Sequence, residues 1–92
     1  MNTYNAMKTD IKKLQTRIAA RQRWCDAEIK KQDIEMARMY EKDVKDLTDI
    51  LDLIVSGNYH SAWSTIYWVD TAVREEIPVR LYNFIAAEND AC

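Results

Sequence analysis

Glycine and proline are missing from the long stretch between Thr3 and Val55. These two residue types break helices most strongly, so their absence favours continuous helix. The whole chain of 92 residues contains one glycine and one proline, which excludes a fold built from many tight turns. Its length is that of a single domain. We therefore predict one all-α domain spanning residues 1–92.

Apolar residues recur through this stretch at a regular interval. When the polar members Arg21 and Gln32 are counted, the mean spacing is about 3.6 residues, the period of a straight α-helix rather than the 3.5 of a strict heptad. One face is therefore apolar along its length, and we call its first five members the N-terminal seam. The seam comprises Tyr4, Met7, Ile11, Leu14 and Ile18, and the face continues through Cys25, Ile29, Met36, Tyr40, Val44, Leu47, Leu51 and Ile54.

Two helical arrangements fit residues 3–55. The first is one long helix, which would reach about 80 Å. The second is a helical hairpin that bends between Lys30 and Asp33, with Asp33 as the N-cap of its second helix. We favour the long helix and keep the hairpin, broken near Asp33, as the alternative.

The remainder of the chain predicts two shorter helices. Gly57 can take the left-handed conformation that ends a helix, and Asn58 can cap the next one. A second helix is therefore expected over about 59–75. Pro78 disfavours helical geometry in the residue before it and suits a first turn, so a third helix is expected over 78–87. The residues after it are expected to fray.

Charge is unevenly distributed along the chain. Residues 1–31 carry eight Lys and Arg against three Asp and Glu, whereas residues 32–92 carry five against twelve. Within the basic part, Lys13, Arg17 and Arg21 follow i, i+4 spacing. Such a stripe can contact nucleic-acid phosphates, or it can flank a coiled-coil seam and pair with acidic residues of a partner. It can equally be an ordinary solvated face.

Acidic residues form a second regular series. Asp43, Asp46, Asp49 and Asp52 repeat every three residues, which places them on a slanted stripe around a helix. A row of carboxylates can imitate nucleic-acid phosphates, but Lys42 and Lys45 interrupt this one. A solvated helix face is the simpler interpretation, and recognition of a partner through these carboxylates is the alternative.

The residue types present give little support for a catalytic or metal-binding site. A cysteine or serine nucleophile needs a base within reach, usually histidine, and the one histidine, His60, is expected beside an exposed turn. Cys25 lies on the apolar face, where a small buried hydrophobe is the ordinary role. With Cys92, the chain has three Cys and His residues, too few for a tetrahedral zinc site. We therefore predict that the protein is not an enzyme and has no cofactor or metal.

Neither a membrane span nor a signal peptide is evident, because no apolar run is long enough and the first residues lack a basic-then-apolar order. Two cysteines make no disulfide framework. A cytoplasmic location is expected.

Trp68 is the best candidate for a binding residue outside the seam. On a helical wheel it falls nearly opposite the apolar face of Ala62, Ile66 and Val73, among small neighbours. A large aromatic ring rising from small residues is typical of an interface anchor. The alternative is that the third helix folds back over this side and buries Trp68.

Two segments resemble known proteins. Residues 57–62 resemble the inter-helix turn of a tetratricopeptide repeat, which implies two closely packed antiparallel helices at Ala62. Residues 70–78 carry a resemblance to the small accessory proteins that bacteriophages encode to disarm or redirect host machinery. That resemblance implies a host enzyme or defence complex as the target and the host cytoplasm as the location.

A single long helix over residues 3–55 has a consequence for function. Two short helices can cover about half of it, so the seam would need a second chain to cover it. We therefore predict a helical protein-interaction module that binds a host protein, another copy of itself, or both. The alternative is a nucleic-acid-binding regulator that uses the basic N-terminal part.

Overall fold

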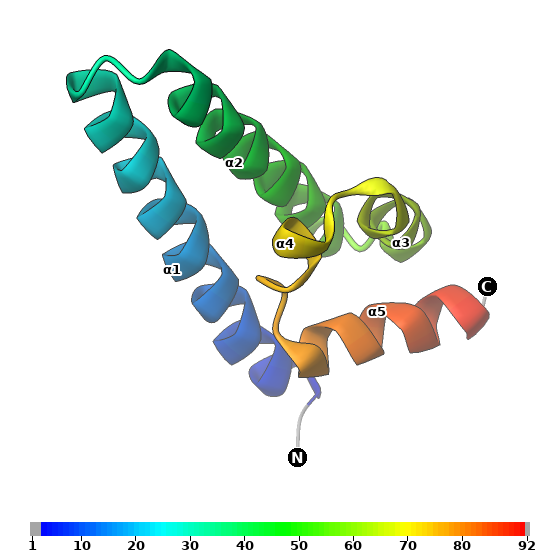
Figure 1. Cartoon of the computed structure of the whole chain (residues 1–92). Helices are drawn as coiled ribbons and strands as arrows, with labels where there is room; N and C mark the ends of the chain where they lie inside the picture. Colours follow the sequence, from blue (N-terminus) through cyan, green and yellow to red (C-terminus); the bar gives the residue numbers. More distant parts are fainter. Residues whose placement is uncertain (1–2, 92) are drawn as a thin grey trace.

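The computed structural model describes residues 3–91, and the side chains of residues 7–90. Within that range the chain forms five helices and no strand (Figure 1). These are α1 (Thr3–Lys30), α2 (Ile34–Val55), α3 (Tyr59–Trp68), α4 (Thr71–Arg74) and α5 (Val79–Ala91). Helices α1 and α2 make an antiparallel hairpin, and α3, α4 and α5 gather at its open end. The all-α prediction is confirmed.

The single long helix over residues 3–55 is wrong, and the hairpin is correct. The chain reverses at Gln32, which has a left-handed backbone with φ of 63°. The Gln32 N–H donates to the Ile29 carbonyl at 3.0 Å, and the Asp33 N–H donates to the Glu28 carbonyl at 2.9 Å. This pair of bonds is a Schellman motif, which satisfies the last carbonyls of a helix.

The second helix of the hairpin begins as predicted. The Asp33 carboxylate accepts a hydrogen bond from the Met36 N–H at 3.2 Å, so it satisfies one of the free amides of the first turn. Gln32 and Asp33 together therefore end one helix and start the next within a turn of three residues. The molecule extends 46 × 25 × 19 Å, far shorter than a single helix would be.

The turn at Gly57 uses the same motif as the turn at Gln32. Gly57 has φ of 80°, its N–H donates to the Ile54 carbonyl, and the Asn58 N–H donates to the Leu53 carbonyl. The Asn58 side chain accepts from the Ser61 N–H at 3.4 Å. Both predicted roles, the left-handed glycine and the asparagine cap, are confirmed.

The predicted helix over 59–75 is interrupted. Helix α3 ends at Trp68, Val69 and Asp70 have extended backbone, and the four-residue α4 follows. Pro78 lies one residue before α5, where its carbonyl accepts the Tyr82 N–H at 2.9 Å. Helix α5 continues to Ala91, so the expectation that it ends at Ala87 is wrong.

The core lies where the open end of the hairpin meets α3 to α5. Helix α2 supplies more of it than any other helix, because its apolar positions face both α1 and α3. The buried side chains of the core are Leu14, Leu47, Ile50, Leu51, Ile54, Ala62, Ile66, Val73, Ile77, Leu81 and Ile85. We call this part of the molecule the body.

The N-terminal seam packs on the body of its own chain. Leu14 is fully buried, and Met7, Ile11 and Ile18 pack against the core cluster. Tyr4 lies outside the described side chains. The expectation that the seam has nothing in its own chain to pack on is therefore wrong, since it depended on the single long helix.

Beyond the body, the hairpin continues as two helices that pack mainly on each other. We call residues 20–43 the arm. Two small residues, Cys25 and Ala37, are the buried hydrophobic side chains of this range. Large apolar side chains remain about half exposed there, namely Trp24, Ile29, Ile34 and Met39.

Candidate functional site

Two adjacent aromatic rings project from the end of α3. Trp68 is 82% exposed and Tyr67 is 67% exposed. Their rings meet edge to face, with centroids 5.4 Å apart and planes at 83°. On the opposite side of the same helix, Ala62 and Ile66 are buried. Trp68 therefore lies on the outer face, as the helical wheel indicated, and α5 does not cover it.

Arg74 holds the backbone that carries these rings. Its guanidinium donates to the carbonyl oxygens of Ile66, Tyr67 and Val69 at 3.2, 3.1 and 3.3 Å. The last carbonyls of a helix have no partner within the helix, and a cation there also complements the helix dipole. Arg74 thus fixes the end of α3 and the direction in which Trp68 projects. Arg74 does not stand out in the sequence, because the break after Trp68 that gives it a role was not predicted.

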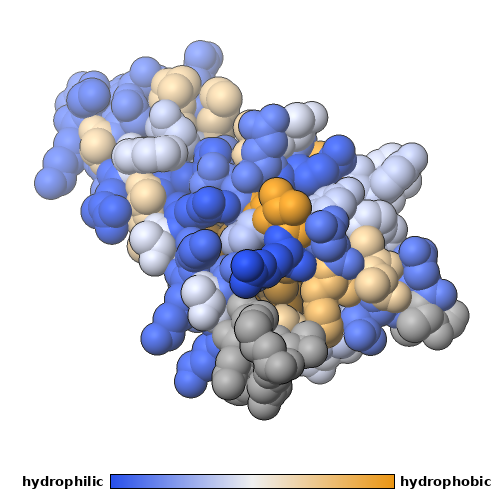
Figure 2. All heavy atoms as spheres, turned by 90° about the horizontal axis from the view of Figure 1, so that it is seen from below, coloured by the Kyte–Doolittle hydropathy of each residue, from blue (hydrophilic) through white to orange (hydrophobic). Residues whose placement is uncertain are grey.

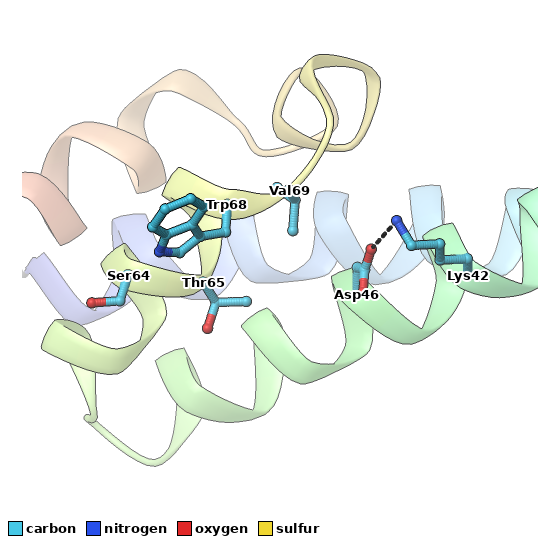
Figure 3. A pocket seen from close by; sticks show the side chains of 6 residues that line it. All are labelled: Lys42, Asp46, Ser64, Thr65, Trp68 and Val69. Carbon is cyan, nitrogen blue, oxygen red and sulfur yellow. Dashed lines mark ion pairs between the residues drawn. The ribbon is translucent and has the colours of Figure 1, made fainter.

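A shallow hollow of about 390 Å³ lies beside Trp68, between α2 and α3. We call it the Trp68 hollow. Figure 3 shows the indole on one side of it, with Thr65 on α3 and Val69 just after α3, and with Lys42 and Asp46 on α2. Its lining residues are Lys42, Asp46, Ser64, Thr65, Trp68 and Val69.

Lys42 makes two long ion pairs at this hollow. Its Nζ lies 3.8 Å from Asp46 Oδ2 and 3.9 Å from Asp70 Oδ2. The Lys42 side chain is 65% exposed and that of Asp70 is 75% exposed. Both distances exceed a hydrogen bond, and exposed pairs of this kind contribute little stability. Lys42 and Asp70 are therefore open to an incoming molecule, whereas the Asp46 side chain is 22% exposed and offers its carboxylate from within the hollow.

The predicted basic stripe is largely used inside the molecule. Arg17 Nη1 donates to the Glu76 carbonyl at 2.6 Å. Arg21 Nη1 pairs with Asp43 Oδ2 at 2.7 Å, and its Nε lies 3.6 Å from Glu76 Oε2. Lys13 is exposed. The two arginines thus tie α1 to α2 and to the loop before α5.

The Asp43 carboxylate is partly buried in this arrangement. Desolvation raises the pKa of the Asp43 carboxyl above the ordinary 3.8, although the Arg21 guanidinium acts to lower it. The neighbouring carboxylates of Asp46 and Asp70 raise the same pKa further. The Arg21–Asp43 pair therefore orients the helices more than it stabilises the charged carboxylate.

The acidic series along α2 does not form one continuous row. Asp43 is bound to Arg21, Asp46 lines the Trp68 hollow, and Asp49 lies 3.8 Å from Lys45. Asp52 is exposed. The structure therefore brings Asp46 of this series together with Trp68, and separates the others from it.

The sulfur and imidazole groups have separate partners. The Cys25 thiol is buried in the arm and lies 3.3 Å from the Ala37 carbonyl. Burial raises its pKa, and the carboxylates of Asp26 and Glu41 raise it further, so little thiolate forms at neutral pH. His60 Nδ1 lies 2.8 Å from Asn89 Oδ1. Cys92 is outside the described residues, among which no group of three or more metal-ligating side chains is present.

A second hollow, of about 600 Å³, lies between the start of α1 and the ends of α2 and α5. It is mainly apolar and is lined by Met7, Lys8, Ile11, Ile54, Val55, Tyr59, Phe84 and Glu88. Figure 2, which views the molecule from below, shows a mostly hydrophilic face with hydrophobic atoms gathered near its middle. Two seam residues, Met7 and Ile11, thus border an open space as well as the core.

No protein-family model, curated protein or solved structure matches this chain. No helix in the described part of the chain is long and apolar enough to cross a membrane. The candidate site is therefore defined by its own geometry.

Proposed function

We propose that this protein is a helical interaction module that binds another protein through Trp68, Tyr67 and the Trp68 hollow. The observation that carries the proposal is the 82% exposure of Trp68 beside a Tyr67 that is 67% exposed. Two large rings in water are costly, whereas buried tryptophan and tyrosine are the commonest anchors of protein interfaces.

The way these rings are held supports the same proposal. Arg74 bonds three carbonyls at the end of α3, so the backbone under the rings is fixed before a partner arrives. A fixed anchor loses less conformational entropy on binding. The flanking Ser64 and Thr65 are small, which leaves room for a partner's surface around the indole.

The resemblance of residues 70–78 to bacteriophage accessory proteins suggests the class of target. Under this proposal the protein occludes a host enzyme or defence complex by binding it. Nucleic-acid binding has less support, because Arg17 and Arg21 of the predicted basic stripe already bond within the chain. Self-association through the seam also has less support, since Leu14 is buried in the body.

Affinity capture from bacterial lysate with a matched pair of variants tests the proposal. Trp68→Ala should reduce capture of the partner about thirtyfold, because loss of a central interface tryptophan costs about 2 kcal/mol or more. Met39→Ala, which truncates a 60% exposed apolar side chain on the arm, should leave capture unchanged. Both variants should melt within a few degrees of the unaltered protein, since neither residue is in the core.

Quantitative mass spectrometry of the captured proteins gives the result. A partner enriched equally by the unaltered protein and both variants would mean that it binds elsewhere. The absence of any protein whose capture depends on Trp68 would remove the basis of the proposal.

A further inference from the structure

The surroundings of the Trp68 hollow are acidic. Residues 40–76 carry eight Asp and Glu against three Lys and Arg. Of those three cations, Arg74 is bound to the carbonyls at the end of α3 and Lys45 lies 3.8 Å from Asp49. Lys42 is the cation that lines the hollow itself. An aromatic face thus stands next to carboxylates whose charge is only partly compensated.

We propose that the Trp68 hollow receives two basic side chains, arginine or lysine, from a basic segment of the partner protein. The inference rests on the proposed function and names the chemistry of its partner. A cation placed over the indole face of Trp68 is attracted by the negative face of the ring. The indole is directed away from Asp46 (Figure 3), so a second basic side chain of the same segment is the one that pairs with the carboxylate of Asp46 or Asp70. Arginine fits best in both places, because its planar guanidinium can stack on an aromatic ring and can donate to a carboxylate.

Lys42 occupies the position of the second cation, the one that pairs with the carboxylates, in the free protein. Its ammonium lies between Asp46 and Asp70, at 3.8 and 3.9 Å, without a hydrogen bond to either. An incoming guanidinium can displace it at little cost and make the shorter bonds that Lys42 does not make. Lys42 is therefore a competitor of the partner, and removing its charge strengthens the site.

A second copy of this chain is the competing occupant. Helix α1 presents the exposed basic residues Lys12, Lys13 and Arg23. The bonds of Arg17 and Arg21 within the chain, however, remove two cations from the face that a second copy would offer. A separate basic segment therefore fits the hollow better than α1 does.

Titration with short blocked peptides, followed by NMR of the full chain, tests the inference. The probe is a hexapeptide with two arginines, and its control has citrulline, the neutral isostere, at both places. The indole N–H signal of Trp68 should shift saturably with the arginine peptide and not with the citrulline peptide. Binding should weaken as salt is raised, because the pairs at the hollow are exposed.

Four variants test which side chains contribute to binding of the arginine peptide. Trp68→Ala and Asp46→Asn should each weaken binding of the arginine peptide about fivefold, the size expected for one exposed cation–π contact or charge-assisted bond. The matched control Asp52→Asn removes an exposed carboxylate of α2 outside the hollow and should have no effect beyond long-range screening. Lys42→Gln should strengthen binding about twofold, because it removes the competing ammonium. The amides of Thr65 and Val69 report binding when the indole is absent.

Each other outcome overturns the inference. Equal binding of the citrulline peptide would show that charge is not recognised. Equal losses in Asp46→Asn and Asp52→Asn would show non-specific attraction to an acidic protein. Weaker binding in Lys42→Gln would show that Lys42 belongs to the site. A dimer that depends on Trp68, seen by light scattering and resistant to the peptide, would make the second copy the occupant.

The two proposals can fail separately. If capture of a partner depends on Trp68 but the arginine peptide does not bind, the proposal of a basic segment is wrong and the proposed protein-binding function stands. If the peptide binds in the hollow but no captured protein depends on Trp68, the proposed function fails.

Discussion

The arm and the body are built from the same two helices but are stabilised differently. In the body, α2 contacts α3 and α1 contacts α5, so Leu14, Leu47 and Ile50 are fully buried. In the arm the same helices pack mainly on each other, apart from Arg21 and Lys42, which reach Glu76 and Asp70 at its inner end. The buried hydrophobic side chains there are the small Cys25 and Ala37. A pair of helices has no third layer, so it cannot surround a large side chain.

The arm compensates for its thin interface with polar and aromatic contacts. Arg21 pairs with Asp43 across the two helices at 2.7 Å, and its guanidinium lies 5.7 Å from the centre of the Trp24 ring. Trp24 in turn meets Tyr40 with ring centroids 5.8 Å apart. Apolar burial therefore stabilises the body, while oriented contacts set the register of the arm. Mutations in the two regions should therefore differ in size and in kind.

The largest expected effect is truncation in the body. Leu81→Ala removes a fully buried side chain and should lower the free energy of unfolding by about 2–5 kcal/mol. Met39→Ala in the arm should change it by about 0.5 kcal/mol or less. Urea denaturation measures both. Similar losses in the two variants would mean that the arm is packed as tightly as the body.

A smaller effect is expected at the polar contact of the arm. Arg21→Met should lower the free energy of unfolding by about 2 kcal/mol, because it leaves the Asp43 carboxylate partly buried without its cation. Asp43→Asn should cost less, since burial already disfavours the charged form of Asp43. Thermal and urea unfolding of the two variants at neutral pH checks this asymmetry. Equal losses in the free energy of unfolding would indicate that the charge on Asp43 stabilises the fold as much as its cation does.

The smallest expected effect is a dependence on pH. Because the pKa of Asp43 is raised in the folded chain, the folded state holds this proton more tightly than the unfolded state. The stability from this group is therefore complete below the ordinary pKa of 3.8 and is lost as pH rises through the raised value. The free energy of unfolding of the unaltered protein, relative to Asp43→Asn, should fall over that interval. A relative rise would mean that Arg21 lowers the pKa more than burial raises it.

The candidate site was partly predictable from sequence. The helical wheel placed Trp68 opposite Ala62 and Ile66, and the structure has Trp68 exposed and the other two buried. The interval between residues on one helix gives the side on which Trp68 lies, but whether α5 covers that side stayed open until the structure was known. The approach of Asp46 and Lys42 to Trp68 was not predictable, because it depends on how α2 and α3 pack together.

Two polar residues on the apolar face, Arg21 and Gln32, mark structural changes that their spacing does not indicate. Arg21 marks the point at which the face leaves the body, and there it bonds Asp43 and lies near Glu76. Gln32 marks the turn itself. A spacing count treats both as interruptions of one helix, since the residues that contact them are distant in sequence.

Three features follow from local sequence alone: the helical period, the glycine turn at Gly57 and the side of its helix on which Trp68 lies. The cap at Asp33 was predicted only with the hairpin alternative, and the exposure of Trp68 depended on where α5 packs. The same Schellman motif ends α1 and α2, but it was predictable at Gly57 and not at Gln32, because glycine alone takes a left-handed backbone without strain. The fold back at Gln32 was decided by tertiary structure. A left-handed non-glycine residue costs roughly 1–2 kcal/mol, whereas burying one large apolar side chain contributes about 1.5–3 kcal/mol. Packing α1 against α2 buries several such side chains, Leu14 and Leu47 among them, so the hairpin is favoured over the straight helix.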